Sequence, residues 1–181
     1  MSTCLHEIIA NVKSFEDSLT SSSLLAKLLA SSSKYKEAMG NCLSVLSNLG
    51  EEISPDVSFP VVQNELAVIQ TTLATITLEQ VKRLPPMTDQ SKLNAMKFLS
   101  MLCMYSIISK VRLTVEHGFC DSSITSTTNN NIATLPSPSF QPMLLPVFSC
   151  RMVRLTIEHG FCDSSIVGLT TAGYGLVRYL Q

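Results

Sequence analysis

Residues 21–50 read SSSLLAKLLASSSKYKEAMGNCLSVLSNLG, and this stretch decides the fold class. Leucines at positions 24, 25, 28 and 29 have the i, i+1, i+4, i+5 spacing of an amphipathic helix. After a Ser-Ser-Ser-Lys turn, apolar residues from Cys42 to Leu49 share one broad face of a second helix. Gly50 follows, and glycine adopts the left-handed conformation that commonly ends a helix. Two such helices joined by a tight turn predict an antiparallel hairpin.

Helical spacing continues beyond this hairpin. The segment 60–75 places on one side the residues Val61, Val62, Leu66, Ile69 and Leu73. Its β-branched residues leave a strand open, but its length and its 3–4 spacing favour a helix. We expect a short turn over 78–84, which ends at Pro85-Pro86 because proline disfavours helix in the residue before it.

The second half predicts three more helices. Thr88-Asp89 supplies an N-cap for a helix over 90–108, whose stripe contains Leu93, Met96, Leu99, Cys103 and Ile107. A final hairpin is expected over about 144–159 and 164–180. The predicted fold class is therefore all-α, with antiparallel helical hairpins stacked as a tetratricopeptide-like array.

An internal duplication is the most unusual feature of the sequence. VRLTVEHGFCDSSI at 111–124 recurs as VRLTIEHGFCDSSI at 153–166, and only position 115 against 157 differs. The flanking sequences are unrelated, which indicates a recent partial duplication or a gene-model artefact. An apolar segment with small residues follows the second copy, whereas a polar segment follows the first. We therefore expect 153–166 to be the structural copy and 111–124 the surplus one.

The segment 121–146 differs from its surroundings in composition. Ser, Thr and Asn dominate its first half, and four prolines interrupt the second. Such a run buries too little apolar surface to offset its ordering entropy, so we expect a disordered or loosely packed insert. The predicted organisation is a helical-hairpin region at 1–110, the partial duplicate plus low-complexity insert at 111–142, and a C-terminal hairpin of the same array at 143–181.

The share of charged residues and the net charge bear on how the surface is used and on whether the chain binds nucleic acid. Hydrophobic residues make up 45% of the chain and charged residues only 15%, against a usual charged share of about 25%. Two interpretations stay open: a Ser/Thr-rich surface around a buried core, or a fragment whose ends pack on missing neighbours. A net charge of −1 and scattered cations argue against nucleic-acid binding.

The sequence predicts no membrane span and no secretory signal. Its longest apolar stretch, 166–180, is too short for a bilayer and contains Arg178. The N-terminus has no basic region followed by an apolar run. Six dispersed cysteines without a C-x-x-C pair are then expected to be reduced thiols in an intracellular, cytoplasmic protein.

The candidate chemistry lies in the two His-Gly-Phe-Cys turns. His117, Cys120, His159 and Cys162 form a Cys₂His₂ zinc set in principle. However, H-x-x-C is not a standard ligand spacing, and duplication explains the doubling without a metal. A Cys/His nucleophilic pair with Glu158 or Asp163 as the orienting group lacks an identifiable oxyanion hole.

The favoured interpretation of the second turn is structural. It predicts a helix that ends at His159, Gly160 as the residue after it, and Asp163 or Ser164 capping the next helix. No catalytic residue, metal ligand or cofactor site is therefore assigned.

Other motifs also favour structure over chemistry. The glycine-rich run from Gly168 to Gly175 lacks the Lys-Ser/Thr of a phosphate loop, so its glycines predict close helix contacts. The kinase motifs H-R-D, D-F-G and V-A-I-K are absent. The methionines Met96, Met101 and Met104 are expected to fill the core.

With these motifs in view, the chain resembles the tetratricopeptide-like helical region of large signalling proteins. Those proteins join a Ser/Thr-kinase-like domain, an AAA-type ATPase domain, this helical region and often a GAF and histidine-kinase output. Three stretches carry the likeness: KYKEA at 34–38 with CLSVLSNLG at 42–50, LPPMTD at 84–89 with KLNAM at 92–96, and RMVRLTIEHG at 151–160 continuing to Tyr174-Gly175.

The resemblance covers about 20–108 and 140–180 and departs at 109–139. It implies architecture together with intramolecular coupling or partner binding, because the kinase and ATPase domains have no counterpart here. We therefore expect a non-enzymatic helical scaffold or interaction module, a fragment or truncated paralogue of such a signal-transduction ATPase/kinase. Its expected partner is another protein or the neighbouring domains of a larger one. The alternative is a small zinc- or thiol-dependent protein that uses the two His-Gly-Phe-Cys turns.

Overall fold

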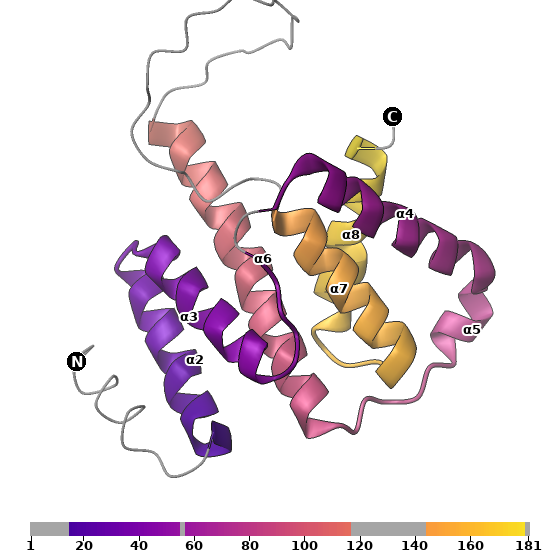
Figure 1. The fold of residues 1–181 in the computed structure, drawn as a ribbon, viewed down its shortest axis with the longest axis horizontal. Coiled ribbons are helices and arrows are strands. Elements are labelled where there is room, and N and C mark those ends of the chain that lie inside the picture. The colour runs from indigo at the N-terminus through magenta and orange to yellow at the C-terminus, as the bar shows by residue number, and fades with distance from the viewer. Residues whose placement is uncertain (1–14, 55–56, 117–143, 180–181) are drawn as a thin grey trace, which may run out of the picture.

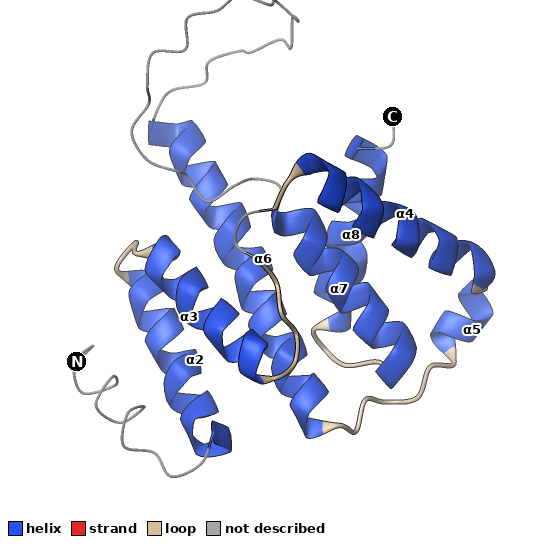
Figure 2. Cartoon of the chain, in the orientation of Figure 1, coloured by secondary structure: helices blue, strands red, loops and turns tan. Residues whose placement is uncertain are grey.

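The computed structural model describes residues 15–54, 57–116 and 144–179, and these form an all-α fold (Figures 1 and 2). The helices are α2 (Phe15–Ser31), α3 (Tyr35–Asn48), α4 (Phe59–Thr75), α5 (Leu78–Lys82), α6 (Gln90–Glu116), α7 (Leu144–His159) and α8 (Ser165–Tyr179). Within these ranges the sheet-like pairing is one isolated backbone bridge, between Pro86 and Phe161. The all-α part of the predicted fold class is confirmed, and the tetratricopeptide-like stacking stays a prediction.

The predicted α2–α3 hairpin is present, and its ends form as expected. The turn is closed by the bond from Lys34 N–H to the Leu29 carbonyl at 2.9 Å. Gly50 has φ +81°, and the next amide bonds back to the Leu46 carbonyl, which is the arrangement that commonly terminates a helix. Asn41 donates to the Ser22 carbonyl at 2.8 Å and joins the two helices side by side.

Packing does not follow chain order, because α6 lies between α3 and α7 (Figure 1). α3 packs on α6, α6 packs on α7, and α7 pairs with α8. α4 packs across α7 and α8. The α2–α3 hairpin and α4 are therefore at opposite sides of α6 and α7.

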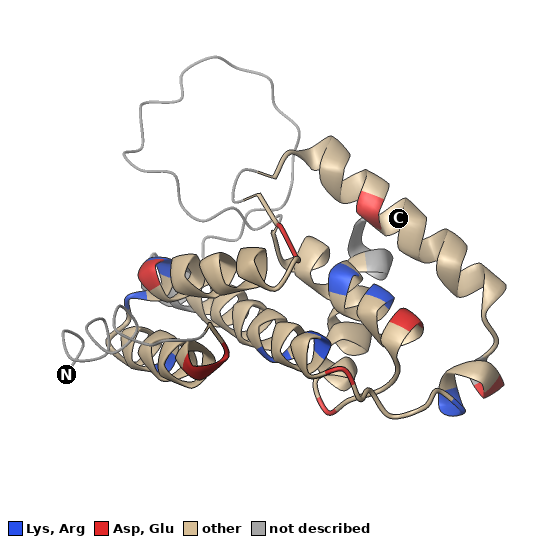
Figure 3. Cartoon of the chain, turned by 60° about the horizontal axis from the view of Figure 1, so that its bottom comes forward, with Lys and Arg blue, Asp and Glu red and all other residues tan. Residues whose placement is uncertain are grey.

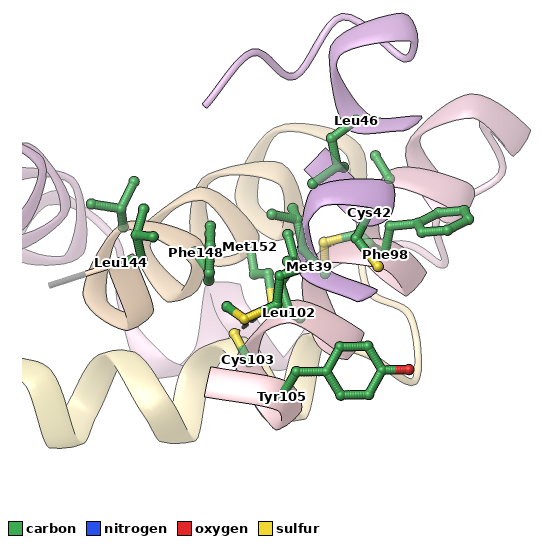
Figure 4. Close-up of a cluster of buried hydrophobic side chains, with 14 of the residues drawn as sticks. Met39, Cys42, Leu46, Phe98, Leu102, Cys103, Tyr105, Leu144, Phe148 and Met152 are labelled. Atoms are coloured by element: carbon green, nitrogen blue, oxygen red, sulfur yellow. Dashed lines mark hydrogen bonds between the residues drawn. The ribbon is translucent and has the colours of Figure 1, made fainter. Parts of the chain in front are cut away.

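The core lies where α3, α6 and α7 meet (Figure 4). Its largest fully buried side chains include Met39, Phe98, Leu102, Phe148 and Met152. Burying such side chains contributes roughly 1.5–3 kcal/mol each.

One expectation about the methionines is wrong. Met96 is fully buried and Met101 packs at the core edge, but Met104 is exposed. α6 has apolar residues on more than one face, so the 3–4 spacing does not decide which of them faces inward.

The ends of α5 and α6 differ from the sequence-based expectation. Residues 78–82 form a helix and not a turn, because Thr77 and Gln80 make a reciprocal capping box. α6 begins as predicted, since Asp89 Oδ1 accepts from the amides of Ser91 and Lys92 at 2.8 and 3.2 Å. It continues to Glu116, so the proposed boundary at 110/111 falls inside a helix.

The predicted insert at 121–146 lies outside the described residues up to position 143, as does most of the first copy. For the last three residues of the insert the prediction is wrong, because 144–146 begin α7, where Leu144 and Pro146 are buried. The residues Val111 to Glu116 of the first copy belong to α6. The two expected C-terminal helices are present as α7 and α8.

A buried carboxylate connects the loop after α3 to two helices. Glu51 is almost fully buried and accepts from Lys92 Nζ on α6 at 2.9 Å and from Arg151 Nη1 on α7 at 3.4 Å. Burying a charge is costly unless it is paired, so both cations are needed to stabilise Glu51 in this position. This cluster fixes the start of the connection to α4.

Candidate functional site

The second His-Gly-Phe-Cys turn is part of a backbone joint. The amide of Phe161 donates to the Pro85 carbonyl at 2.7 Å, and the amide of Met87 donates to the Phe161 carbonyl at 2.8 Å. The turn after α7 is therefore bonded to the segment that precedes α6. Two of the motifs that carry the resemblance, at 84–89 and 151–160, meet here.

Gly160 is required at this joint for two reasons. Its φ of +104° lies where side chains other than glycine are strained. A Cβ at this position would also overlap the carbonyl oxygen of Pro85 and lie 3.1 Å from the amide of Met87. The predicted helix end at His159 followed by Gly160 is confirmed.

The start of α8 is held by a residue that the sequence analysis did not select. Ser165 Oγ accepts from the amide of Cys162 at 3.0 Å and lies 2.8 Å from Thr156 Oγ1, from which it also accepts. Ser165 and Thr156 are both buried. The hydroxyl that joins turn and helix thus belongs to Ser165, which follows the expected Asp163 and Ser164 in the sequence.

Half of the candidate zinc set lies outside the described residues. His117 and Cys120 belong there, so the four-ligand hypothesis stays untested. His159 is partly exposed, with Nε2 at 3.9 Å from Glu158 Oε2, and Cys162 Sγ is 3.6 Å from Ser165 Oγ. In the described ranges, no three His, Cys, Asp or Glu residues gather closely enough to hold a metal ion.

The core cysteines are held as protonated thiols. Burial raises the pKa of Cys42, Cys103 and Cys150 to about 12 each. Cys103 Sγ lies 3.8 Å from Met152 Sδ inside the core (Figure 4). Because the thiolate is the reactive form, these three cysteines are poor nucleophiles at neutral pH.

The predicted role of the glycines in α8 is partly confirmed. A Cβ on Gly168 would lie 2.6 Å from Met152 Cβ, so Gly168 permits the close approach of α7 and α8. Gly175 is buried close to Leu66 of α4, where an added Cβ would be 3.9 Å from Leu66 Cδ2. Gly173 does not have this role, because an added Cβ would have no neighbour within 4 Å among the described residues.

The most distinctive surface of the described structure is the outward side of α4. We call it the α4 stripe and define it as Val61, Asn64, Val68, Thr71 and Thr75. These residues are all exposed and follow one another at i+3 or i+4, so they share one side of the helix. The opposite side buries Val62, Leu66 and Ile69 against the rest of the fold.

The α4 stripe carries no charge. Glu65, which is half-buried, is the one charged residue among the 17 of α4. Figure 3 shows this single acidic position and no Lys or Arg along the helix. A surface helix normally presents charged side chains to water, so an uncharged outward side is unusual.

The hydroxyls of three threonines on α4 bond to the backbone of the helix itself. Thr71, Thr72 and Thr75 donate to the carbonyls of Ala67, Val68 and Thr72, at 2.9, 2.8 and 2.7 Å. Covering these side chains would leave no hydroxyl hydrogen without an acceptor. Covering these three threonines therefore costs little desolvation of their hydroxyls.

A shallow hollow of about 440 Å³ lies on the same surface, lined by Ala67, Val68, Thr71, Thr72 and Thr75. The short side chains of alanine and threonine leave room there for bulky residues of another helix. The apolar spacing of 60–75 groups Val61 with Val62, Leu66, Ile69 and Leu73 on one side, so it does not predict this surface. Val61 and Val62 are adjacent, and the structure buries the second and exposes the first.

Comparison of the chain with protein-family models, with curated proteins and with solved structures finds no match. None of the helices in the described ranges is both long and apolar enough to cross a membrane.

Proposed function

We propose that this chain is a non-catalytic helical scaffold that binds a helical segment of another protein, or of a neighbouring domain, through the α4 stripe. The observation that carries the proposal is an exposed, uncharged helix side whose threonine hydroxyls are satisfied internally. Docking of a helix by its apolar face is a common mode of recognition.

The wider setting of the proposal comes from the resemblance to the tetratricopeptide-like region of kinase/ATPase signalling proteins. On that basis the chain is a fragment or truncated paralogue of such a protein, and it acts in the cytoplasm in signal transduction. In a stacked array of hairpins, each terminal helix receives the next repeat. The α4 stripe has the properties of such a terminal surface.

The size of the protein in a cell lysate tests this function. The tagged full chain is expected to migrate as a particle much larger than the 19.8 kDa monomer. Val68→Glu introduces a charge into the α4 stripe and should shift the particle toward the monomer. Ser47→Glu, at an exposed position on α3, should leave the size unchanged.

An unchanged particle size in Val68→Glu would contradict the assignment of the interface to α4. Circular dichroism of both variants should match that of the parent chain, because both positions are exposed and helical.

A further inference from the structure

One charged residue of α4 lies beside the α4 stripe. Glu65 follows Val61 by four residues and precedes Val68 by three, so its side chain adjoins both on the helix surface. It lies seven residues before Thr72, which lines the hollow. Glu65 is half-buried and is the one acidic position that Figure 3 shows on α4. A negative charge is therefore held at the edge of an otherwise uncharged surface.

The carboxylate of Glu65 is not paired with a cation in the part of the chain that the structure describes. α4 packs on α7, but Arg151 of α7 pairs with Glu51 instead, with Nη1 3.4 Å from Oε2. Cys150 of α7 is close enough to respond to Glu65, because its pKa is raised first by burial and then by this negative charge. On the protein side, Glu65 thus meets a buried thiol and not a compensating charge.

A partner that covers the hollow also covers Glu65, which borders it. Removing a carboxylate from water without a cation costs free energy, whereas a cation that pairs with the carboxylate offsets that cost. The neighbouring threonine hydroxyls add little to the cost, because they bond to their own helix. Charge at this one position therefore discriminates between partners: an acidic or neutral helix loses binding free energy here, and a basic helix does not.

We propose that the helix received by the α4 stripe carries, beside its apolar side, a Lys or Arg that pairs with Glu65. This inference rests on the proposed function, because it names the chemistry of the partner of the same surface. The apolar stem of a Lys or Arg packs along the hollow while its charged end reaches the carboxylate. The apolar residues of the partner supply the contact area, and the pair with Glu65 sets which helices bind and in which orientation.

Selection from a phage-displayed library of amphipathic helices tests the proposal. The library has a fixed leucine stripe with randomised positions on both sides of it, and the bait is the purified full chain. The selected peptides are expected to be enriched in Lys or Arg on one side of the stripe. The same selection on Glu65→Lys should enrich Asp or Glu at those positions, because the charge at the edge of the hollow is reversed.

Two further variants give the controls. Glu16→Lys makes the same change of net charge at an exposed position on α2 and should leave the preference for Lys or Arg unchanged. Glu65→Gln keeps the shape of the side chain and should weaken binding of the best basic peptide by roughly tenfold or more. Urea denaturation of Glu65→Gln should show no loss of stability, whereas a residue with a purely structural role would lower the free energy of unfolding.

The contrary outcomes are distinct. No charge preference on the parent chain, or the same basic preference on Glu65→Lys, overturns the inference; if Val68→Glu still abolishes binding of those peptides, the α4 stripe remains a helix-binding surface. Peptides that bind Val68→Glu as well as the parent chain reject the proposed function itself. A library that yields no binder overturns the inference, and the particle size in a lysate then decides the proposed function on its own.

Discussion

The amide nitrogen of Phe161 lies 2.7 Å from the carbonyl oxygen of Pro85, and this bond joins the α7–α8 turn to the segment before α6. The turn reaches Pro85 because Gly160 adopts a positive φ and has no side chain to keep the two backbones apart. The second His-Gly-Phe-Cys turn, at 159–162, thus joins the end of α7 to the segment before α6 through its backbone.

Gly160→Ala is predicted to destabilise the fold by roughly 2–4 kcal/mol, because the strained φ adds to the overlap with Pro85. Urea denaturation measures this free energy of unfolding. Gly40→Ala is the matched control: Gly40 lies inside α3, and an added Cβ would have no neighbour within 4 Å among the described residues. That change should stabilise the protein by about 0.5–1 kcal/mol.

The equivalent change in the first copy, Gly118→Ala, should leave the free energy of unfolding nearly unchanged if 153–166 is the structural copy. Equal losses from Gly118→Ala and Gly160→Ala would contradict that assignment.

Local signals in the sequence were sufficient for most helix ends. Gly50, Asp89 and Gly160 each end or begin a helix where their residue type predicts it, because a cap depends on a few neighbouring backbone groups. The Thr77–Gln80 capping box is a local signal of the same kind, and it makes 78–82 a helix where a turn is expected. The bridge between Pro86 and Phe161 had no such signal, since backbone pairing over this separation depends on the whole fold.

The candidate surface was harder to predict than the helices. α4 and α6 have apolar residues on both sides, so spacing alone does not show which side faces the core. Val61 and Met104 were both assigned inward and are both exposed. Their position depends on α4 packing across α7 and α8 and on α6 packing between α3 and α7, which is information about tertiary structure.

Glu51→Gln is predicted to cost about 2–4 kcal/mol of folding stability, because it removes the negative charge between Lys92 and Arg151 in a mostly buried site. The matched change Glu52→Gln, at the exposed neighbouring position, should have an effect within about 0.5 kcal/mol. Thermal and urea unfolding of the two variants gives the comparison; equal effects would show that the Glu51 pairs contribute nothing beyond a surface carboxylate.

Alkylation of the native protein at neutral pH should spare Cys42, Cys103 and Cys150 and should modify Cys162, which is partly exposed. In urea all four should react at similar rates. Mass spectrometry of the labelled peptides measures the difference. Fast native labelling of Cys103 would contradict its position in the core.

Folding stability should fall as the pH rises from about 9 toward 12. The unfolded thiols lose their protons near the ordinary pKa of 9.0, whereas the folded thiols of Cys42, Cys103 and Cys150 keep theirs to about 12. The unfolded state therefore binds fewer protons in this window, and raising the pH favours it. Urea midpoints across this range give the slope, and Cys42→Ala should reduce it.

Site-specific photo-crosslinking at position 68 tests most directly whether the α4 stripe is a binding surface. A photoreactive residue in place of Val68, in the full chain in cells, is expected to give a discrete crosslinked product that Thr71→Glu abolishes. The same photoreactive residue at position 47 on α3 should give no such product. Equal crosslinking from both positions, or a product that is insensitive to Thr71→Glu, would contradict the account.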